Sequence, residues 1–198
     1  MNRSIALYGG SFDPVSSAHA AMVNYLSEKF DRVIVAPTLQ SVEGKHHRYS
    51  FDERIQLLQA CGFPGNVEVS RIEHDLHDQT NGYTIGLLEV VSREFGDAPT
   101  LIIGSDQLHQ IDRWKRWKEI VYDYKIMVNL RPGYPFNRYP WLAGAPEPKL
   151  IYLPPTDISS TDIRRLCMRK QVDLAANLIP AGCRDLFKRL ELDLTERE

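Results

Sequence analysis

The sequence predicts an α/β fold in which a doubly wound parallel sheet carries helices on both faces. Three observations predict it. Short apolar runs typical of strands alternate with amphipathic helical runs, the loops after the strands hold most of the unusual residues, and 198 residues suffice for one substantial core. We therefore expect one Rossmann-like domain over residues 1–198, in which residues 156–198 form a helical C-terminal subregion.

Six strands are expected from short runs of aliphatic and β-branched residues. They cover residues 4–8, 32–36, 67–72, 100–103, 125–130 and 149–153. Pro37 ends the second strand and Gly104 follows the fourth. Because helical runs separate the strands, we expect βαβ units and hence a parallel sheet.

Helices are expected where apolar residues recur at i and i+4, as Ala18, Met22 and Leu26 do in the first of them. Asp52 and Glu53 favour a helix start, because acidic side chains stabilise the first turn. The expected helical ranges are 18–30, 51–60, 84–94, about 112–121 and 160–192. Residues 40–49 and the proline-rich residues 132–148 are expected to be loops.

Composition excludes several classes of partner. The formal net charge is −2, so no basic field argues for nucleic acid. No apolar run approaches the roughly 18 residues of a membrane span, so we expect no membrane partner. Three scattered cysteines without CxxC spacing are typical of reduced thiols in a cytoplasmic protein.

The most unusual loop is GGSFDPVSSAHA, residues 9–20, because ligands of parallel sheets bind beyond the carboxyl ends of strands. Its glycines allow close approach and positive φ, and the following helix start can bind an anion. Ser16 or Ser17 can cap that helix, which places His19 in its first turn. The alternative is a tight turn with a capping serine and a surface histidine. GxGxxG and GxxxxGK[ST] are absent, which disfavours dinucleotide oxidoreductases and P-loop proteins.

A second such loop is PPTDISSTDIRR, residues 154–165. Ser159 or Ser160 can cap the helix that follows, with Asp162 in its first turn and Arg164 one turn in. Hydroxyls, N–H groups and an arginine at a helix start favour a second anion site. The alternative is an ordinary capped helix with solvated arginines.

Together these motifs resemble the HxGH-type nucleotidyltransferase superfamily, and within it the nicotinate/nicotinamide mononucleotide adenylyltransferases. The motifs that carry the resemblance are GGSFDP at 9–14 with His19, YTI at 83–85, IIGSDQL at 102–108 with Trp114, RPG at 131–133, ISSTDIR at 158–164 and the closing LIPAGCRDLFKRLEL. One tetrad departs from the family: Ser16-Ser17-Ala18-His19 has Ser and Ala where His and Gly are usual. Superfamily relatives place Thr at the first position, so a hydroxyl is compatible with activity.

The resemblance implies transfer of AMP from ATP to the 5′-phosphate of a pyridine mononucleotide, with release of pyrophosphate, in NAD biosynthesis. It leaves the choice between nicotinate and nicotinamide mononucleotide open, as it does homo-oligomerisation. Mg²⁺ is expected to arrive with ATP, since the sequence has no dedicated metal motif and the adjacent histidines of KHHR make a poor chelate.

The resemblance also assigns site residues. Catalytic roles fall to His19, Ser16 and Arg164. ATP-binding roles fall to Gly9, Gly10, Ser11, Phe12, His19, Gly104, Asp106, Ile158, Ser159, Ser160, Thr161 and Arg164. Mononucleotide-binding roles fall to Lys45, Thr84, Trp114 and Arg131.

Three of these residues have plainer readings on their own. Trp114 fits core packing of an amphipathic helix, Asp106 fits a loop acid or cap, and Lys45 fits a solvated lysine. Two other functions also stay open: another nucleotidyltransferase of the superfamily, such as one that uses phosphopantetheine, and a nucleotide-binding relative without catalysis.

Overall fold

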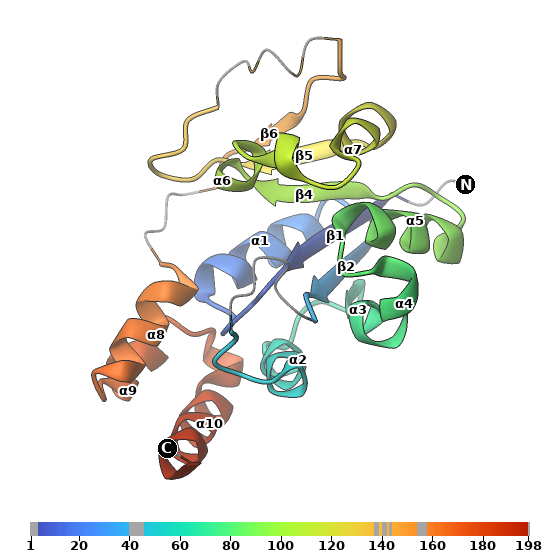
Figure 1. Ribbon diagram of the computed structural model, residues 1–198. Helices are drawn as coiled ribbons and strands as arrows, with labels where there is room; N and C mark the ends of the chain where they lie inside the picture. The colour runs from blue at the N-terminus through green and yellow to red at the C-terminus, as the bar shows by residue number, and fades with distance from the viewer. Residues whose placement is uncertain are drawn as a thin grey trace.

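A computed structural model of the chain describes residues 4–39, 46–136, 139, 142, 144–153 and 158–197. A six-stranded, all-parallel sheet runs through it in the order β3-β2-β1-β4-β5-β6. This is the order of the doubly wound dinucleotide-binding folds. Helices cover both faces (Figure 1), which confirms the predicted fold class.

The elements follow the chain with short connections. In order they are β1 (Ile5–Gly10), α1 (Ser17–Ser27), β2 (Arg32–Pro37), α2 (Phe51–Ala60), β3 (Val67–Val69), α3 (Ile72–Asp75), α4 (His77–Thr80), α5 (Thr84–Phe95), β4 (Thr100–Gly104), α6 (Ser105–Leu108), η1 (Ile111–Arg113), α7 (Trp117–Asp123), β5 (Ile126–Asn129), β6 (Lys149–Ile151), α8 (Ser160–Met168), α9 (Val172–Ala176), η3 (Ala181–Cys183) and α10 (Arg184–Arg197).

Two predicted elements are wrong in their extent. The strand expected over 67–72 ends early, because the Ser70 hydroxyl accepts the Ile72 N–H at 3.3 Å and a short helix begins there. The helix expected over 112–121 is interrupted, since Arg116 has a left-handed φ of 53°. The region expected to be helical over 160–192 consists of α8, α9, η3 and α10.

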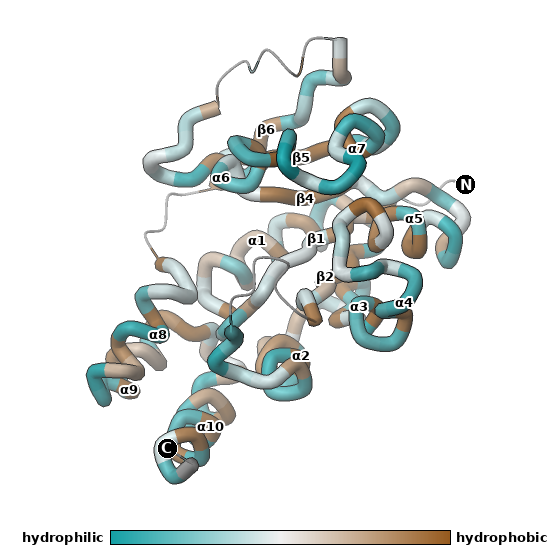
Figure 2. The backbone as a smooth tube through the Cα atoms, in the orientation of Figure 1, coloured by the Kyte–Doolittle hydropathy of each residue, from teal (hydrophilic) through white to brown (hydrophobic). Residues whose placement is uncertain are grey.

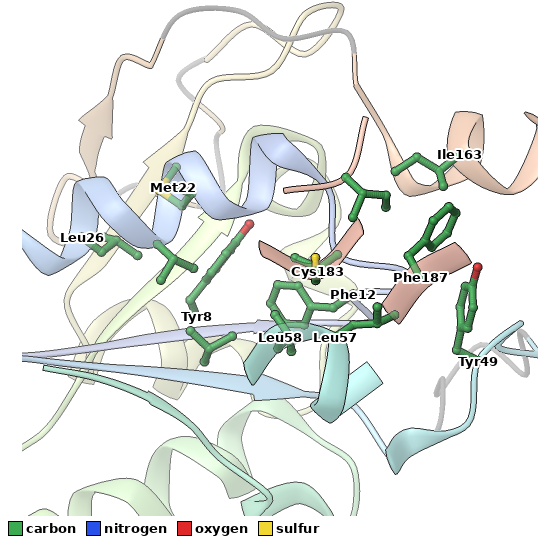
Figure 3. Packing of buried hydrophobic residues seen from close by; sticks show 14 of the residues in the cluster. Tyr8, Phe12, Met22, Leu26, Tyr49, Leu57, Leu58, Ile163, Cys183 and Phe187 are labelled. Carbon is green, nitrogen blue, oxygen red and sulfur yellow. The ribbon is translucent and has the colours of Figure 1, made fainter. Parts of the chain in front are cut away.

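Two hydrophobic clusters sandwich the sheet. Along β1, Ala6 and Tyr8 point into one cluster and Ile5 and Leu7 into the other, as the alternation of a strand requires. Figure 3 shows the first cluster, to which α1, α2 and α10 contribute side chains. Figure 2 shows hydrophobic residues along the central strands and polar residues on the outer helices. The second cluster is covered mainly by α5 and α7.

The C-terminal helices complete the face that carries α1 and α2. The backbone N–H of Ser17, at the start of α1, donates to the Leu178 carbonyl at 2.9 Å. Helix α10 packs on α2 and on α9 (Figure 1). The chain segment between α9 and η3 therefore lies beside the first helix.

The register brings the carboxyl ends of the strands to one edge. Gly10 pairs with Pro37, and Gly104 pairs with Asn129, which in turn pairs with Ile151. The loops with the predicted site residues therefore begin at the same edge of the sheet. Among the helices of the described residues, none has the length and apolar character needed to cross a bilayer.

Candidate functional site

The loop after β1 turns sharply at a phenylalanine. Phe12 has a left-handed φ of 46°, whereas Gly9 and Gly10, the residues expected to supply positive φ, do not. A Cβ at Gly10 would lie 3.3 Å from the Phe12 ring, so this glycine leaves room for that ring. The ring is buried and contacts His19 edge-on, with centroids 5.1 Å apart. The Phe12 ring is therefore not exposed for the nucleotide contact expected of this residue.

Helix α1 begins with a reciprocal cap between Ser16 and His19. The Ser16 hydroxyl accepts the His19 N–H at 3.3 Å, and the Ser16 N–H donates to His19 Nδ1 at 3.1 Å. Because Nδ1 accepts a hydrogen bond, the proton of the neutral ring lies on Nε2. The first turn of α1 therefore presents a histidine with a defined donor nitrogen.

Loss of hydration keeps that half-buried histidine neutral. This loss, together with the smaller effect of the positive charge of Arg131, lowers the pKa of His19 to about 4. At neutral pH the ring is then an uncharged Nε2–H donor. It can stabilise an anionic oxygen without first losing a proton.

Ser16 itself is fully buried. Its hydroxyl lies 3.0 Å from His19 Nδ1 and also caps α1, so its hydrogen bonds are directed at His19. The hydroxyl that replaces the family's first histidine thus orients the second histidine. The N–H groups of Ser17 and His19 are likewise bonded within the protein, to Leu178 and Ser16. The start of α1 therefore offers an anion fewer free N–H groups than the sequence predicts.

The start of α8 touches the loop after β1 directly. Ser159 is the N-cap and accepts the Asp162 N–H at 3.2 Å. The Ser160 hydroxyl donates to the Pro14 carbonyl at 2.8 Å, and Arg164 donates to the Asp13 carbonyl at 2.6 Å. Two motifs about 150 residues apart in sequence therefore share one site.

The other residues of this motif surround that contact. The Arg164 guanidinium also donates to the Thr161 hydroxyl at 3.1 Å. Thr161 is exposed, while Ile158 is half-buried against the first hydrophobic cluster. The arginine is held from both sides and remains partly accessible.

Asp106 and Arg131 form an ion pair beyond the ends of β4 and β5. Arg131 Nη1 lies 3.1 Å from Asp106 Oδ2, and the other carboxylate oxygen is buried without a hydrogen-bond partner. Gly104 makes this pair possible: a Cβ there would lie 2.2 Å from Asp106 Oδ1 and 2.8 Å from Arg131 Nε. A predicted ATP-binding residue and a predicted mononucleotide-binding residue are thus in contact.

The remaining predicted residues are less closely gathered. Trp114 follows η1 in an extended conformation and is half-buried against the second cluster with Tyr83. Thr84 is the first residue of α5 and is half-buried. Lys45 lies outside the described residues. In the part of the chain that the structure describes, no three His, Cys, Asp or Glu side chains gather to hold a metal ion.

Arg54 is a structural residue that the sequence reading missed. It is almost fully buried in α2, and its guanidinium donates to the carbonyls of Ser11 and Thr38, both at 2.8 Å. It therefore ties the loop after β1 to the loop after β2. Its position one turn before Leu58 on the inward face of α2 was the available signal.

Asp13 is the second missed residue. Its carboxylate is buried and accepts the backbone N–H groups of Arg48 and Tyr49, each at 3.0 Å. Arg164 Nη1 lies 3.7 Å from the same carboxylate. Asp13 therefore joins the loop after β1 to the segment that precedes α2.

Comparison with known proteins agrees with this geometry. The model of the family described as cytidylyltransferase-like matches residues 7–166. A protein of Solibacter usitatus named "Probable nicotinate-nucleotide adenylyltransferase" is 30% identical over 185 residues, covering 90% of each chain. A protein of Bacteroides thetaiotaomicron with the same name is 30% identical and covers 83% of this chain and 82% of its own.

Solved structures share the fold. The Plasmodium falciparum nicotinic acid mononucleotide adenylyltransferase, solved in complex with NaAD, superimposes with a TM-score of 0.80 at 18% identity. The match covers 96% of this chain and 97% of that chain. The family model and the Solibacter relative extend over most of the sequence. The chain therefore belongs to the cytidylyltransferase-like family and, within it, to the nicotinate-nucleotide adenylyltransferases.

Proposed function

We propose that this chain transfers AMP from ATP to nicotinate mononucleotide, which yields the dinucleotide and pyrophosphate, as a step of NAD biosynthesis. Its family membership and the name shared by its relatives support this reaction. The observation that carries the proposal is the direct contact between the loop after β1 and the start of α8, together with the Ser16–His19 cap where that loop ends. We propose nicotinate mononucleotide rather than nicotinamide mononucleotide as the acceptor, because the relatives are named after it.

This reaction needs positioning and charge stabilisation more than a strong base. The attacking mononucleotide phosphate is already an oxyanion, and negative charge accumulates on the departing pyrophosphate. The donors offered here are suited to that charge: His19 Nε2–H and the guanidinium of Arg164. We assign both to the phosphates of ATP, and we assign Ser16 to the orientation of His19.

We assign the rest of the ATP site to the loops around this contact. The remaining residues are Gly9, Gly10, Ser11, Phe12, Gly104, Asp106, Ile158, Ser159, Ser160 and Thr161. Exposed Gly9 and Ser11 offer backbone to the phosphates. Asp106 offers its unpartnered buried oxygen to a ribose hydroxyl.

We assign the mononucleotide to the other side of the same edge. Arg131, whose guanidinium is exposed and paired with Asp106, is suited to a phosphate or carboxylate. Trp114 is suited to stacking on the pyridine ring, and Thr84 to a hydrogen bond from the start of α5. Lys45 completes the assignment by its sequence motif alone.

Mg²⁺ belongs to this proposal as a companion of ATP. The described residues hold no cluster of three metal-ligating side chains, so the ion would be carried by phosphate oxygens and water. When bound, it would neutralise part of the triphosphate charge. We place the enzyme in the cytoplasm on the strength of its three cysteines, which are free thiols in the structure.

An acceptor panel tests the reaction. Purified protein with ATP and Mg²⁺ is given nicotinate mononucleotide, nicotinamide mononucleotide or phosphopantetheine, and pyrophosphate release is measured. We expect release with nicotinate mononucleotide above all. Release only with phosphopantetheine would overturn the substrate, and ATP binding with no release for any acceptor would indicate a non-catalytic relative.

His19→Ala is the internal test of the site. Loss of a preorganised donor to developing charge should lower kcat by about 100-fold or more. Turnover equal to that of the parent would remove His19 from the reaction.

A further inference from the structure

A buried carboxylate in the last helix is not used by the proposed function. Glu191 of α10 is 1% exposed and lies beyond residues 7–166, the stretch that the family model matches. A carboxylate at this depth is costly unless charged donors surround it. The residues that donate to this carboxylate therefore indicate which segment it holds in place.

Glu191 accepts hydrogen bonds from two consecutive residues. Arg48 donates to it through Nε and Nη2, each at 2.9 Å, in a two-pronged pair. The Tyr49 hydroxyl donates to the same carboxylate. Burial opposes ionisation, yet these donors hold the pKa of Glu191 below its ordinary value, so the group is charged at neutral pH.

The same two residues hold the loop after β1 through their backbone. The N–H groups of Arg48 and Tyr49 both donate to the Asp13 carboxylate at 3.0 Å. The Asp13 carbonyl in turn accepts a hydrogen bond from Arg164 at 2.6 Å. A continuous series of hydrogen bonds thus leads from Glu191 to an arginine of the proposed ATP site.

Apolar packing alone would attach α10 as well. Phe187 of α10 lies against the Tyr49 ring, with centroids 6.3 Å apart, and Figure 3 shows the two side by side. Replacing a buried ion pair by apolar side chains of similar volume is often neutral or stabilising. We therefore expect the ion pair to add little to the attachment of α10. Its hydrogen bonds are directional, however, and they restrain the positions of Arg48 and Tyr49.

We infer that Glu191 is a positioning residue. It fixes residues 48–49, and through Asp13 it keeps the loop after β1 in the arrangement that binds substrate. The inference rests on the proposed function for its effect on catalysis. When only a fraction of the molecules has this arrangement, the apparent affinity for substrate falls in proportion to that fraction. Loosening the restraint should therefore weaken substrate binding in a protein that remains folded.

Glu191→Gln tests this, with Asp193→Asn as the matched control. Asp193 is exposed on the same helix, so its change also replaces a carboxylate by an amide. We expect Glu191→Gln to raise KM for ATP about tenfold in folded protein, because the amide accepts fewer hydrogen bonds and carries no charge. The control should stay within about twofold of the parent. An unchanged KM with a lowered Tm would mean that Glu191 only attaches the helix.

Hydrogen exchange gives a readout that does not depend on activity. Without substrate, the amides of Arg48 and Tyr49 should exchange about tenfold faster in Glu191→Gln than in the parent and in Asp193→Asn. Equal exchange rates would overturn the inference. If the parent forms no product with any acceptor, the proposed reaction fails, while this measurement still decides whether Glu191 holds the segment.

A milder variant covers the case in which Glu191→Gln does not fold. Tyr49→Phe keeps the ring against Phe187 and removes only the hydroxyl that donates to Glu191. We expect Tyr49→Phe to change both measurements in the same direction as Glu191→Gln, but less. KM should rise about two- to fivefold, and the Tyr49 amide should exchange faster than in the parent. A variant that matches the parent in both measurements would count against the positioning role.

Discussion

At the scale of the single residue, a backbone N–H decides how His19 acts. The Ser16 N–H occupies Nδ1, and burial lowers the pKa of the ring to about 4. The side chain is therefore a neutral donor through Nε2 rather than an imidazolium. Any stabilisation of phosphate charge by this residue then depends on orientation, which the Ser16 cap supplies.

This arrangement predicts the titration of His19. In ¹⁵N-histidine NMR spectra, its ring should carry the proton on Nε2 and show no titration between pH 5 and 8, because burial disfavours the charged form. The spectrum of His19→Gln identifies the signal by its absence. A ring that titrates near 6.5 would contradict the half-buried, neutral state.

The same shift has a consequence for stability. Between pH 6.5 and about 4 the unfolded chain binds more protons than the folded chain at this position, so the free energy of unfolding falls as the pH falls. His19→Gln should show a shallower loss of stability over that range than the parent in urea unfolding.

At the scale of the element, the short helices α3 and α4 depend on tertiary contacts. Glu73 of α3 is 3% exposed, and the Thr80 hydroxyl at the end of α4 donates to the His77 carbonyl at 3.4 Å. Gly86 of α5 packs on the Thr80 backbone so closely that a Cβ there would lie 2.4 Å from its carbonyl oxygen. Burial raises the pKa of Glu73 to about 7, while the nearby Thr80 side chain opposes that rise.

Glu73→Gln should therefore alter how stability depends on pH. The folded parent holds the Glu73 proton better than the unfolded chain, so this stabilisation is full below about pH 4.5 and is lost as the pH rises through 7. Relative to the parent, the variant should gain about 1–3 kcal/mol in free energy of unfolding between pH 5 and 8. Urea unfolding curves at several pH values measure this, and parallel curves would contradict it.

At the scale of the whole molecule, the C-terminal helices are part of the site's support. They bond to the start of α1 through Leu178, and α10 holds the segment before α2 through Glu191. The 3₁₀ turn η3 packs on the end of α2, where a Cβ at Gly182 would lie 2.5 Å from the Ala60 carbonyl oxygen. Sequence segments at the two ends of the chain therefore share one packed face of the sheet.

Gly182→Ala should strain this contact, because a backbone oxygen cannot move as freely as a side chain. We expect a loss of about 1–3 kcal/mol in free energy of unfolding. Gly65→Ala is the matched control, since nothing lies within 4 Å of a Cβ there, and it should stay within about 0.5 kcal/mol of the parent or gain slightly. Equal stability of the two variants in urea would show that η3 can shift away from α2.

The sequence by itself determined the fold class, most strands and approximately where α1, α2 and α8 begin. These features are local: side-chain periodicity and a cap depend on residues a few positions apart. Because each motif loop directly follows a strand in the sequence, the predicted strands also placed these loops at the carboxyl edge of the sheet. The roles assigned to individual site residues remain predictions.

Only the tertiary structure decided which distant side chains meet. The Asp106–Arg131 pair, the Arg54 contacts and the Glu191–Arg48 pair join residues from 16 to 143 positions apart. No periodicity or cap encodes such a contact, because it depends on strand order, register and the docking of the last helices. For the same reason the sequence could show that His19 stands in a first turn, while only packing decided that its ring is half-buried and neutral.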